Sequence, residues 1–251
     1  AYSSWRRTET VDHDDVESTP IDRAGARDIV AANLDRGTLA PEQLADLLAG
    51  YGLAMPSTRL VDRNQAVVAA REIGYPVGVK ALSRHVGRSV EAGIALDLTD
   101  DTDVAESVQL MGEHLGDDAA QVYVQQMVPP GADLRIKVTH DERVGPVITV
   151  GIGGLQADAI GDESSRLVPV SSATARSMVA ATRAATLLDE AELLLVADQV
   201  TRVAQLASDH AEIAELDLNP VIVSDEGCWV ADARIMLRRD EHRDDVVRRL
   251  Y

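Results

Sequence analysis

The sequence predicts two α/β lobes joined by a hinge, and three observations indicate this fold class. Strand-like and helix-like segments alternate up to about residue 128. After that point, strand-like segments are accompanied by two long amphipathic helices. Between the two parts lies Pro129-Pro130-Gly131, which cannot continue a sheet and must form a hinge or turn. We therefore expect a linker or arm over residues 1–19, a first lobe with leading helices over 20–128, a second lobe over 129–238 and a charged tail over 239–251.

Each element of the first lobe has a local signal. Asp22 can cap a helix that runs to about Arg36, and Gly37 stops it. Pro41 begins a shorter helix, because proline is tolerated in the first turn. The remaining elements follow in chain order: an extended segment Leu53–Val61, an alanine-rich helix from Asp62 to Gly74, a strand Val77–Leu82, a polar loop Arg84–Glu91, a strand Gly93–Leu98, a helix from Asp101 or Asp103 to Leu115 and a strand Tyr123–Met127.

The second lobe combines strands with helices. Two strands, Leu134–Thr139 and Pro146–Ile152, are joined by a polar turn. Amphipathic periodicity predicts helices over Ser172–Leu187 and Glu190–Asp209. A hairpin ends the lobe, with Ile213–Val223 and Cys228–Ile235 as its two strands around a turn at residues 224–227.

Composition limits the classes of function. The chain has 251 residues and a formal net charge of −18, whereas binding a nucleic-acid backbone requires clustered positive charge. No apolar run approaches the about 20 residues of a membrane span, and no signal peptide opens the chain. The single cysteine, Cys228, excludes an internal disulfide framework and fits a reducing cytoplasm. We expect a cytoplasmic protein without nucleic-acid or membrane partners.

The C-terminal hairpin places oxygen-bearing side chains together. Asp217 and Asn219 are two residues apart on one strand, so they share a face. A four-residue turn at 224–227 places Asn219 opposite Asp232, with Cβ atoms about 5 Å apart. Hard cations such as Mg²⁺ take carboxylate and amide oxygens. From spacing alone an alternative stays open, in which these are solvated residues on an exposed strand, and a bulge at Gly227 would turn Asp232 away.

The hairpin also carries a family resemblance. Glu215-Leu216-Asp217-Leu218-Asn219-Pro220, followed by Ala231-Asp232-Ala233-Arg234, is similar to the metal-binding end of the ATP-grasp module in ADP-forming acyl-CoA synthetases. The resemblance extends over about residues 20 to 238, and the succinyl-CoA synthetase β subunit is a more distant relative. It implies an ATP-grasp fold with a nucleotide cleft between the lobes. It also implies that Asp217, Asn219 and Asp232 are the metal ligands.

Further segments extend the resemblance to the nucleotide. Gly74-Tyr75-Pro76-Val77-Gly78-Val79-Lys80 looks like the family's Gly-Tyr-Pro-Val-x-x-Lys, whose lysine contacts the phosphates, and Lys80 is one of only two lysines in the chain. The segment Val124–Gly131 resembles the lining of the adenine pocket, with Gln126 where the family usually has Glu. By this match the cofactor-binding residues are Lys80, Gln125, Gln126, Met127, Val128, Asp133 (where the family carries Glu) and Arg166, which is expected to meet the γ-phosphate.

One loop departs from the family. Its members carry His-Lys-Ser/Thr-Asp-x-Gly-Gly after the lysine strand, and that histidine can relay a phosphoryl group. Here, aligned back from Gly93, Gly87 occupies the histidine position and Arg88 the lysine position. His85, two residues earlier, is the candidate catalytic relay, and the alternative is an ordinary surface histidine.

The resemblance implies ATP or ADP with Mg²⁺ as cofactors. In the family reaction, acid, CoA and ATP give acyl-CoA, ADP and phosphate through a phosphohistidine. The CoA-binding and phosphohistidine domains, in the same chain or as another subunit, would be the partners, and the ATP-grasp domain is not a competent ligase alone. Two alternatives remain: a regulatory synthetase-like domain of a GNAT-fused protein lysine acetyltransferase, which Gly87 and Gln126 favour, or a structural module without a ligand.

Overall fold

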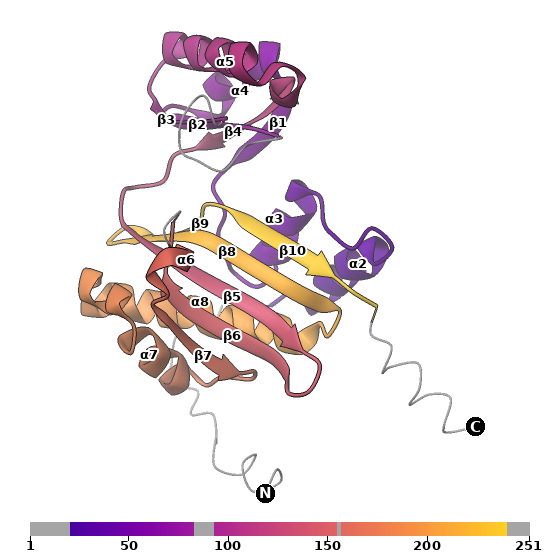
Figure 1. Ribbon diagram of the computed structural model, residues 1–251, viewed down its shortest axis with the longest axis vertical. Helices are drawn as coiled ribbons and strands as arrows, with labels where there is room; N and C mark the ends of the chain where they lie inside the picture. Colours follow the sequence, from indigo (N-terminus) through magenta and orange to yellow (C-terminus); the bar gives the residue numbers. More distant parts are fainter. Residues whose placement is uncertain (1–20, 83–92, 155–156, 240–251) are drawn as a thin grey trace, which may run out of the picture. The chain divides into compact units, whose positions relative to one another are not determined.

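Buried apolar residues recur at every second position of most strands, so these strands have one face that must be covered, and the strands form two antiparallel sheets. The computed structural model describes residues 21–82, 93–154 and 157–239 (Figure 1). Residues 56–129 form one compact unit, and the described residues before and after them form another. We name them the four-stranded unit and the six-stranded unit after their sheets.

The four-stranded unit has the strand order β1-β4-β2-β3. Helices α4 and α5 cover one face of this sheet, because alanine and valine side chains from the strands and both helices form a single core cluster. The Asp100 side chain caps α5 by accepting from the amides of Thr102 and Asp103. The elements are β1 (Thr58–Asp62), η1 (Arg63–Gln65), α4 (Ala66–Ile73), β2 (Val77–Ala81), β3 (Ile94–Leu98), α5 (Asp101–Leu115), η3 (Gly116–Ala119) and β4 (Gln121–Gln126).

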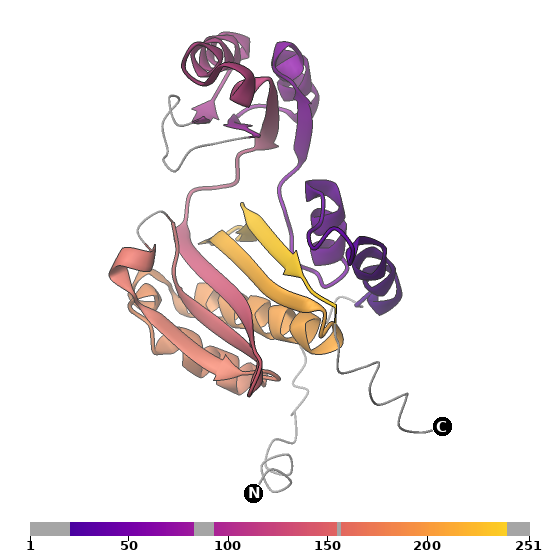
Figure 2. The ribbon, with the colours of Figure 1, turned by 45° about the vertical axis from the view of Figure 1, so that its right-hand side comes forward.

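The six-stranded unit has the strand order β10-β8-β5-β6-β7, with β9 also paired to β8. Figures 1 and 2 show α7 and α8 on one face of this sheet, and α8 contacts β5, β6, β8 and β9. The elements are α2 (Arg23–Asn33), α3 (Pro41–Ala49), β5 (Ala132–Asp141), β6 (Gly145–Ile152), α6 (Ala157–Ile160), β7 (Glu163–Leu167), α7 (Ser172–Ala180), η4 (Arg183–Leu187), α8 (Glu190–Asp209), β8 (Ile213–Ser224), β9 (Gly227–Val230) and β10 (Ala233–Leu237).

The leading helices pack in the six-stranded unit, and not with the first lobe to which the sequence analysis assigned them. Val30 and Leu47 belong to the same core cluster as Ile235 of β10. The Thr38 hydroxyl donates to the Ile235 carbonyl (3.0 Å), and the Leu237 amide donates to the Gly37 carbonyl (2.8 Å). These contacts hold the helices against the sheet that is formed by the C-terminal half of the chain.

A buried polar cluster joins α3 to the end of α8. The Tyr51 hydroxyl donates to Asp209 Oδ2 (2.9 Å) and lies 3.0 Å from His210 Nε2. Because its one proton goes to the carboxylate, the hydroxyl accepts from Nε2–H of His210. The His210 side chain is buried, and this burial lowers its pKa below the usual 6.5, although Glu212 and Asp209 oppose the shift.

This histidine makes stability depend on pH. Well above pH 6.5 neither state carries the proton, so the full stability is present; as the pH falls through 6.5, the unfolded chain takes up a proton that folded His210 resists. We expect acidification from pH 7.5 to 5.5 to cost up to about 1.4 kcal/mol through this residue. Urea unfolding at both pH values checks this. His210→Gln should have a smaller pH loss than wild type, while the exposed-site variant His114→Gln should keep the wild-type loss; equal losses in all three proteins would contradict the assignment.

Outside its hairpin, the second lobe departs from the sequence prediction at two places. The helix predicted over Ser172–Leu187 ends at Ala180, and η4 follows. The break has a tertiary cause, because the Asp162 carboxylate accepts from the amides of Arg183 and Ala184 and so replaces helix hydrogen bonds there. The other departure is the strand β7 and the short helix α6, which the sequence analysis did not predict.

Candidate functional site

The open face of the six-stranded sheet collects the polar side chains that the sequence analysis singled out. Leu134, Ile136 and Val138 of β5 point into the core, so the alternate residues point to the other face. Of the described helices of this unit, the short α6 lies toward that face (Figure 1). Across the strands, one row of cross-strand neighbours consists of Arg234, Asp217, Lys137, Thr149 and Ser165.

The predicted hairpin register is confirmed. Val221 pairs with Val230 and Ser224 with Gly227, and on the far side of the strand break Arg234 pairs with Asp217. The same register places Asn219 opposite Asp232, and the backbone amide of Asn219 donates to the backbone carbonyl of Asp232 (3.0 Å). Asp217 and Asn219 therefore share one face of β8, and Asp232 lies opposite Asn219, in the bend between β9 and β10. The second strand differs only in being divided into β9 and β10.

Arg135 of β5 holds the carboxylate of Asp217. Its Nε donates to Asp217 Oδ1 (2.8 Å), and its Nη2 donates to Asp217 Oδ2 (2.7 Å). Its third nitrogen, Nη1, donates to Asp158 Oδ1 (2.5 Å). The Arg135 and Asp217 side chains are only 13% and 18% exposed, whereas Asp158 is 88% exposed. Asp217 is the first cause of a raised Arg135 pKa, so the guanidinium is firmly charged.

Asn219 fixes the glycine-rich segment that follows β6. Its Oδ1 accepts from the Gly154 amide (2.7 Å), and its Nδ2 faces the Gly154 carbonyl at 3.4 Å. Gly153 crosses the backbone of β5, with its amide donating to the Asp133 carbonyl (2.8 Å). A Cβ at position 153 would lie 2.5 Å from the carbonyl carbon and 2.8 Å from the amide nitrogen of Leu134, so only glycine fits without a shift.

The donor types of this face fit a hard divalent cation, but their present partners do not leave all of them available. Asp217, Asn219 and Asp232 offer carboxylate and amide oxygens, which Mg²⁺ prefers. Both Asp217 oxygens accept from Arg135, and Asp232 Oδ1 accepts from the Ala233 amide (3.0 Å). Within residues 21–82, 93–154 and 157–239, no three His, Cys, Asp or Glu residues are grouped closely enough to hold a metal ion.

The remaining predicted residues of the four-stranded unit divide between its two faces. Lys80 lies between Tyr123 and Ile94 on the face opposite the helices, because Val79 on the same strand is buried in the core. Gln125 shares that open face, and its Nε2 donates to the Thr58 hydroxyl (3.0 Å).

Gln126 follows Gln125 on β4, and alternation places its side chain on the helix side, at the exposed end of the strand. The chain then leaves the sheet through Met127 and Val128, and the Met127 amide donates to the Pro76 carbonyl (3.0 Å).

The last three predicted site residues lie in different parts of the chain. Asp133 shares the open face of β5 with Arg135. Arg166 does not, because its cross-strand partner is the buried Ile148, which places Arg166 on the helix side of the sheet. The structure therefore separates Arg166 from the three acidic and amide residues of the hairpin. His85 lies outside the described residues.

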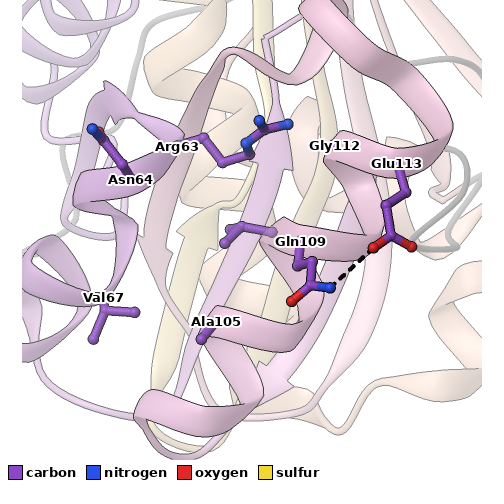
Figure 3. A pocket seen from close by; sticks show the side chains of 8 residues that line it. Arg63, Asn64, Val67, Ala105, Gln109, Gly112 and Glu113 are labelled. Carbon is purple, nitrogen blue, oxygen red and sulfur yellow. Dashed lines mark hydrogen bonds between the residues drawn. The ribbon is translucent and has the colours of Figure 1, made fainter.

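A groove in the four-stranded unit lies between η1, α4 and α5 (Figure 3). It has a volume of about 570 Å³ and combines apolar Val67 and Ala105 with the Gln109–Glu113 hydrogen bond of 2.9 Å. Arg63 packs over Gly112, where a Cβ would collide with its guanidinium. The groove lies among the helices and contains none of the candidate site residues.

Arg135 is the functional candidate that the sequence analysis missed. Its sequence signal is only its alternation with buried residues, in step with Asp133 and Lys137 on the same strand. Cys228, by contrast, remains unsuited to chemistry, because burial raises the pKa of its thiol to about 12.

Comparison with known proteins shows the family to which this fold and these residues correspond. The model of a family described as ATP-grasp domain matches residues 30–237. The ADP-forming 4-hydroxybutyrate–CoA ligase of Nitrosopumilus maritimus is 31% identical over 217 residues, which are 80% of this chain and 31% of the ligase. The β subunit of the ADP-forming acetate–CoA ligase I of Pyrococcus furiosus is 26% identical over 228 residues, which are 85% of this chain and 98% of the subunit.

Solved structures agree with these relatives. The dinucleotide-forming acetyl-CoA synthetase 1 of Candidatus Korarchaeum cryptofilum, in complex with CoA, Ca-AMPCP and HgCl⁺, matches with a TM-score of 0.75 and 30% identity, covering 85% of this chain and 100% of that chain. A second structure of that enzyme, with CoA and Mg-AMPPCP and with the phosphohistidine segment pointing towards the nucleotide-binding site, matches with a TM-score of 0.69. No described helix of this chain is long and apolar enough to cross a membrane.

Proposed function

Because this chain belongs to the ATP-grasp domain family and matches the ATP-grasp part of ADP-forming acyl-CoA ligases, we propose that it is the nucleotide-binding part of such a ligase. The observation that carries the proposal is the hairpin register, which places Asp232 opposite Asn219, two positions along the strand from Asp217. Lys80, on the open face of the other sheet, supports it with a cation suited to phosphate.

Each group has a proposed task. Lys80 neutralises charge on the nucleotide phosphates, and the backbone of 125–128 lines the adenine pocket. Asp217, Asn219 and Asp232 hold the Mg²⁺ that accompanies the phosphates, with Asp133 beside them. Positioning and charge neutralisation are what phosphoryl transfer requires from a protein. Arg166 is not part of this proposal, because it lies on the helix side of the sheet.

The complete reaction requires more than this domain. This chain spans about a third of the 4-hydroxybutyrate–CoA ligase, but almost the full length of the separate Pyrococcus furiosus β subunit. We propose that CoA-binding and phosphohistidine domains, in the same protein or on another subunit, convert acid, CoA and ATP to acyl-CoA, ADP and phosphate. We propose a cytoplasmic location for this assembly. The relatives are named as ligases or ligase subunits, so they give no support to the acetyltransferase alternative.

His85 stays a proposed relay because it lies two residues before Gly87, which occupies the family's histidine position, and it lies outside the described residues. Its test needs the partner domains: acyl-CoA, ADP and phosphate are supplied and ATP formation is followed. His85→Ala should abolish any turnover that passes through this histidine, and unchanged turnover removes it from the relay.

Mg-ATP is expected to stabilise the isolated chain against unfolding. A ligand at 100 times its dissociation constant stabilises the folded state by about 2.7 kcal/mol, because only the folded state binds it. A thermal-shift measurement with Mg-ATP, Mg-ADP or Mg²⁺ alone checks this. The stabilisation should require the nucleotide, and a melting temperature that all three ligands leave unchanged would refute nucleotide binding.

A further inference from the structure

Arg135 occupies the centre of the proposed metal face, and all three of its guanidinium nitrogens donate to carboxylates. Two of them engage both oxygens of Asp217, and the third engages Asp158. The contact with Asp217 is shielded, since neither side chain of the pair is more than 18% exposed. Such a fork-to-fork pair is both directional and stronger than a neutral hydrogen bond.

A guanidinium at this position disfavours the binding of a divalent cation to Asp217. Arginine stays protonated in proteins, so Arg135 cannot release Asp217 by losing its charge. A metal ion on Asp217 would stand within a few ångströms of a fixed positive charge, in a partly buried setting where screening by water is weak. The two cations therefore compete for one carboxylate.

Asp158 provides Arg135 with a second acceptor. It lies on α6, its carboxylate is 88% exposed, and it already accepts from Nη1 at 2.5 Å. The glycine-rich segment ahead of α6 is tied to the metal face by the two contacts between Asn219 and Gly154. If the guanidinium leaves Asp217, it still has an acidic partner within reach.

We propose that Arg135 is a built-in competitor of the divalent metal at Asp217, and that the metal binds this face only when Arg135 moves from Asp217 towards Asp158. The proposal rests on the proposed function, because it takes Asp217 as a metal ligand. The proposal adds that Arg135 lowers the affinity of the nucleotide-free chain for a divalent metal. A purely structural ion pair would behave differently, since its removal would lower stability without strengthening metal binding.

The test is a titration of the whole chain with Mn²⁺ alone, followed by the electron paramagnetic resonance signal of the unbound ion. Arg135→Gln should bind Mn²⁺ at least tenfold more tightly than wild type, because Asp217 is released and a repelling charge is removed. Lys137→Gln is the matched control: Lys137 lies on the same strand and face, two residues on, and pairs with Glu215 at 3.0 Å. It removes the same charge beside Asp217 but leaves the hydrogen bonds from Arg135 to Asp217 in place, so its affinity should stay within about threefold of wild type.

Three results would overturn the proposal. The first is an Arg135→Gln affinity equal to that of wild type, including no binding in either protein. The second is a gain that Lys137→Gln matches. The third concerns Asp158→Asn, an exposed substitution that keeps the competition testable if Arg135→Gln does not fold. Asp158→Asn removes the negative charge of the alternative acceptor and should leave Mn²⁺ affinity equal or weaker, so a stronger affinity contradicts the exchange.

A parallel titration with Mg-ATP separates this inference from the proposed function. If wild type binds Mg-ATP but Arg135→Gln gains no Mn²⁺ affinity, the inference alone fails. If wild type does not bind Mg-ATP at all, the proposed function fails, and the inference fails with it.

Discussion

A Lys80→Met variant is expected to lose about a hundredfold in affinity for ATP. Hydrogen bonds to charged groups contribute about 1.5–3 kcal/mol each, and a hundredfold change in affinity corresponds to about 2.7 kcal/mol. Methionine keeps much of the length and apolar stem of the lysine but removes the charge that the phosphates would meet. Isothermal titration with Mg-ATP measures the change.

The matched control for Lys80 is Arg59→Met, in the same sheet. Arg59 on β1 pairs with the buried Val124, so it lies on the helix face, where it forms an ion pair with Glu72. The control removes one positive charge from the same unit without altering the open face. Its affinity should match that of wild type, and an equal loss in both variants would show that net charge, and not the position of Lys80, governs binding.

Gly153→Ala is expected to destabilise the six-stranded unit by about 2–4 kcal/mol. The added Cβ would enter the backbone of Leu134, and backbone cannot rotate away as a flexible side chain can. Either the glycine-rich segment or β5 must move, and the first movement strains the contact between Asn219 and Gly154. Urea unfolding followed by circular dichroism measures the loss.

Gly161→Ala is the control for this substitution. Gly161 has a φ of 60° but open space around its Cβ position, so alanine there meets only the backbone penalty of about 1–2 kcal/mol. Crowding is the cause at position 153 only if Gly153→Ala costs clearly more. If the two variants lose the same stability, the approach of Gly153 to Leu134 is not a constraint.

The part of the candidate site that sequence alone predicted is the part built from local rules. Two strands joined by a short turn have only a few possible registers, so the position of the turn sets Asn219 opposite Asp232. Strand alternation then places Asp217 on the same face. Lys80 followed from a motif read along one strand, and the strand is present.

Residues brought together by the tertiary fold could not be predicted in this way. Arg135 meets Asp158 and Asp217 across separations of 23 and 82 residues, and nothing in its neighbourhood marks those partners. Arg166 is comparable, because only the pairing of β7 with β6 decides its face. The leading helices are a further example, because they pack against a sheet whose strands come much later in the sequence.

The sequence by itself determined the two-lobe α/β class, the C-terminal hairpin and its register, since alternation, turns and caps act within a few residues. Only the tertiary structure decided where the predicted helix over 172–187 stops and which cation faces Asp217. In the first case Asp162 supplies acceptors to backbone amides 21 and 22 residues away. In the second, the sheet places β5 beside β8 and so gives Asp217 an arginine partner. Both depend on hydrogen bonds between segments that are far apart in the chain, and local patterns carry no information about those.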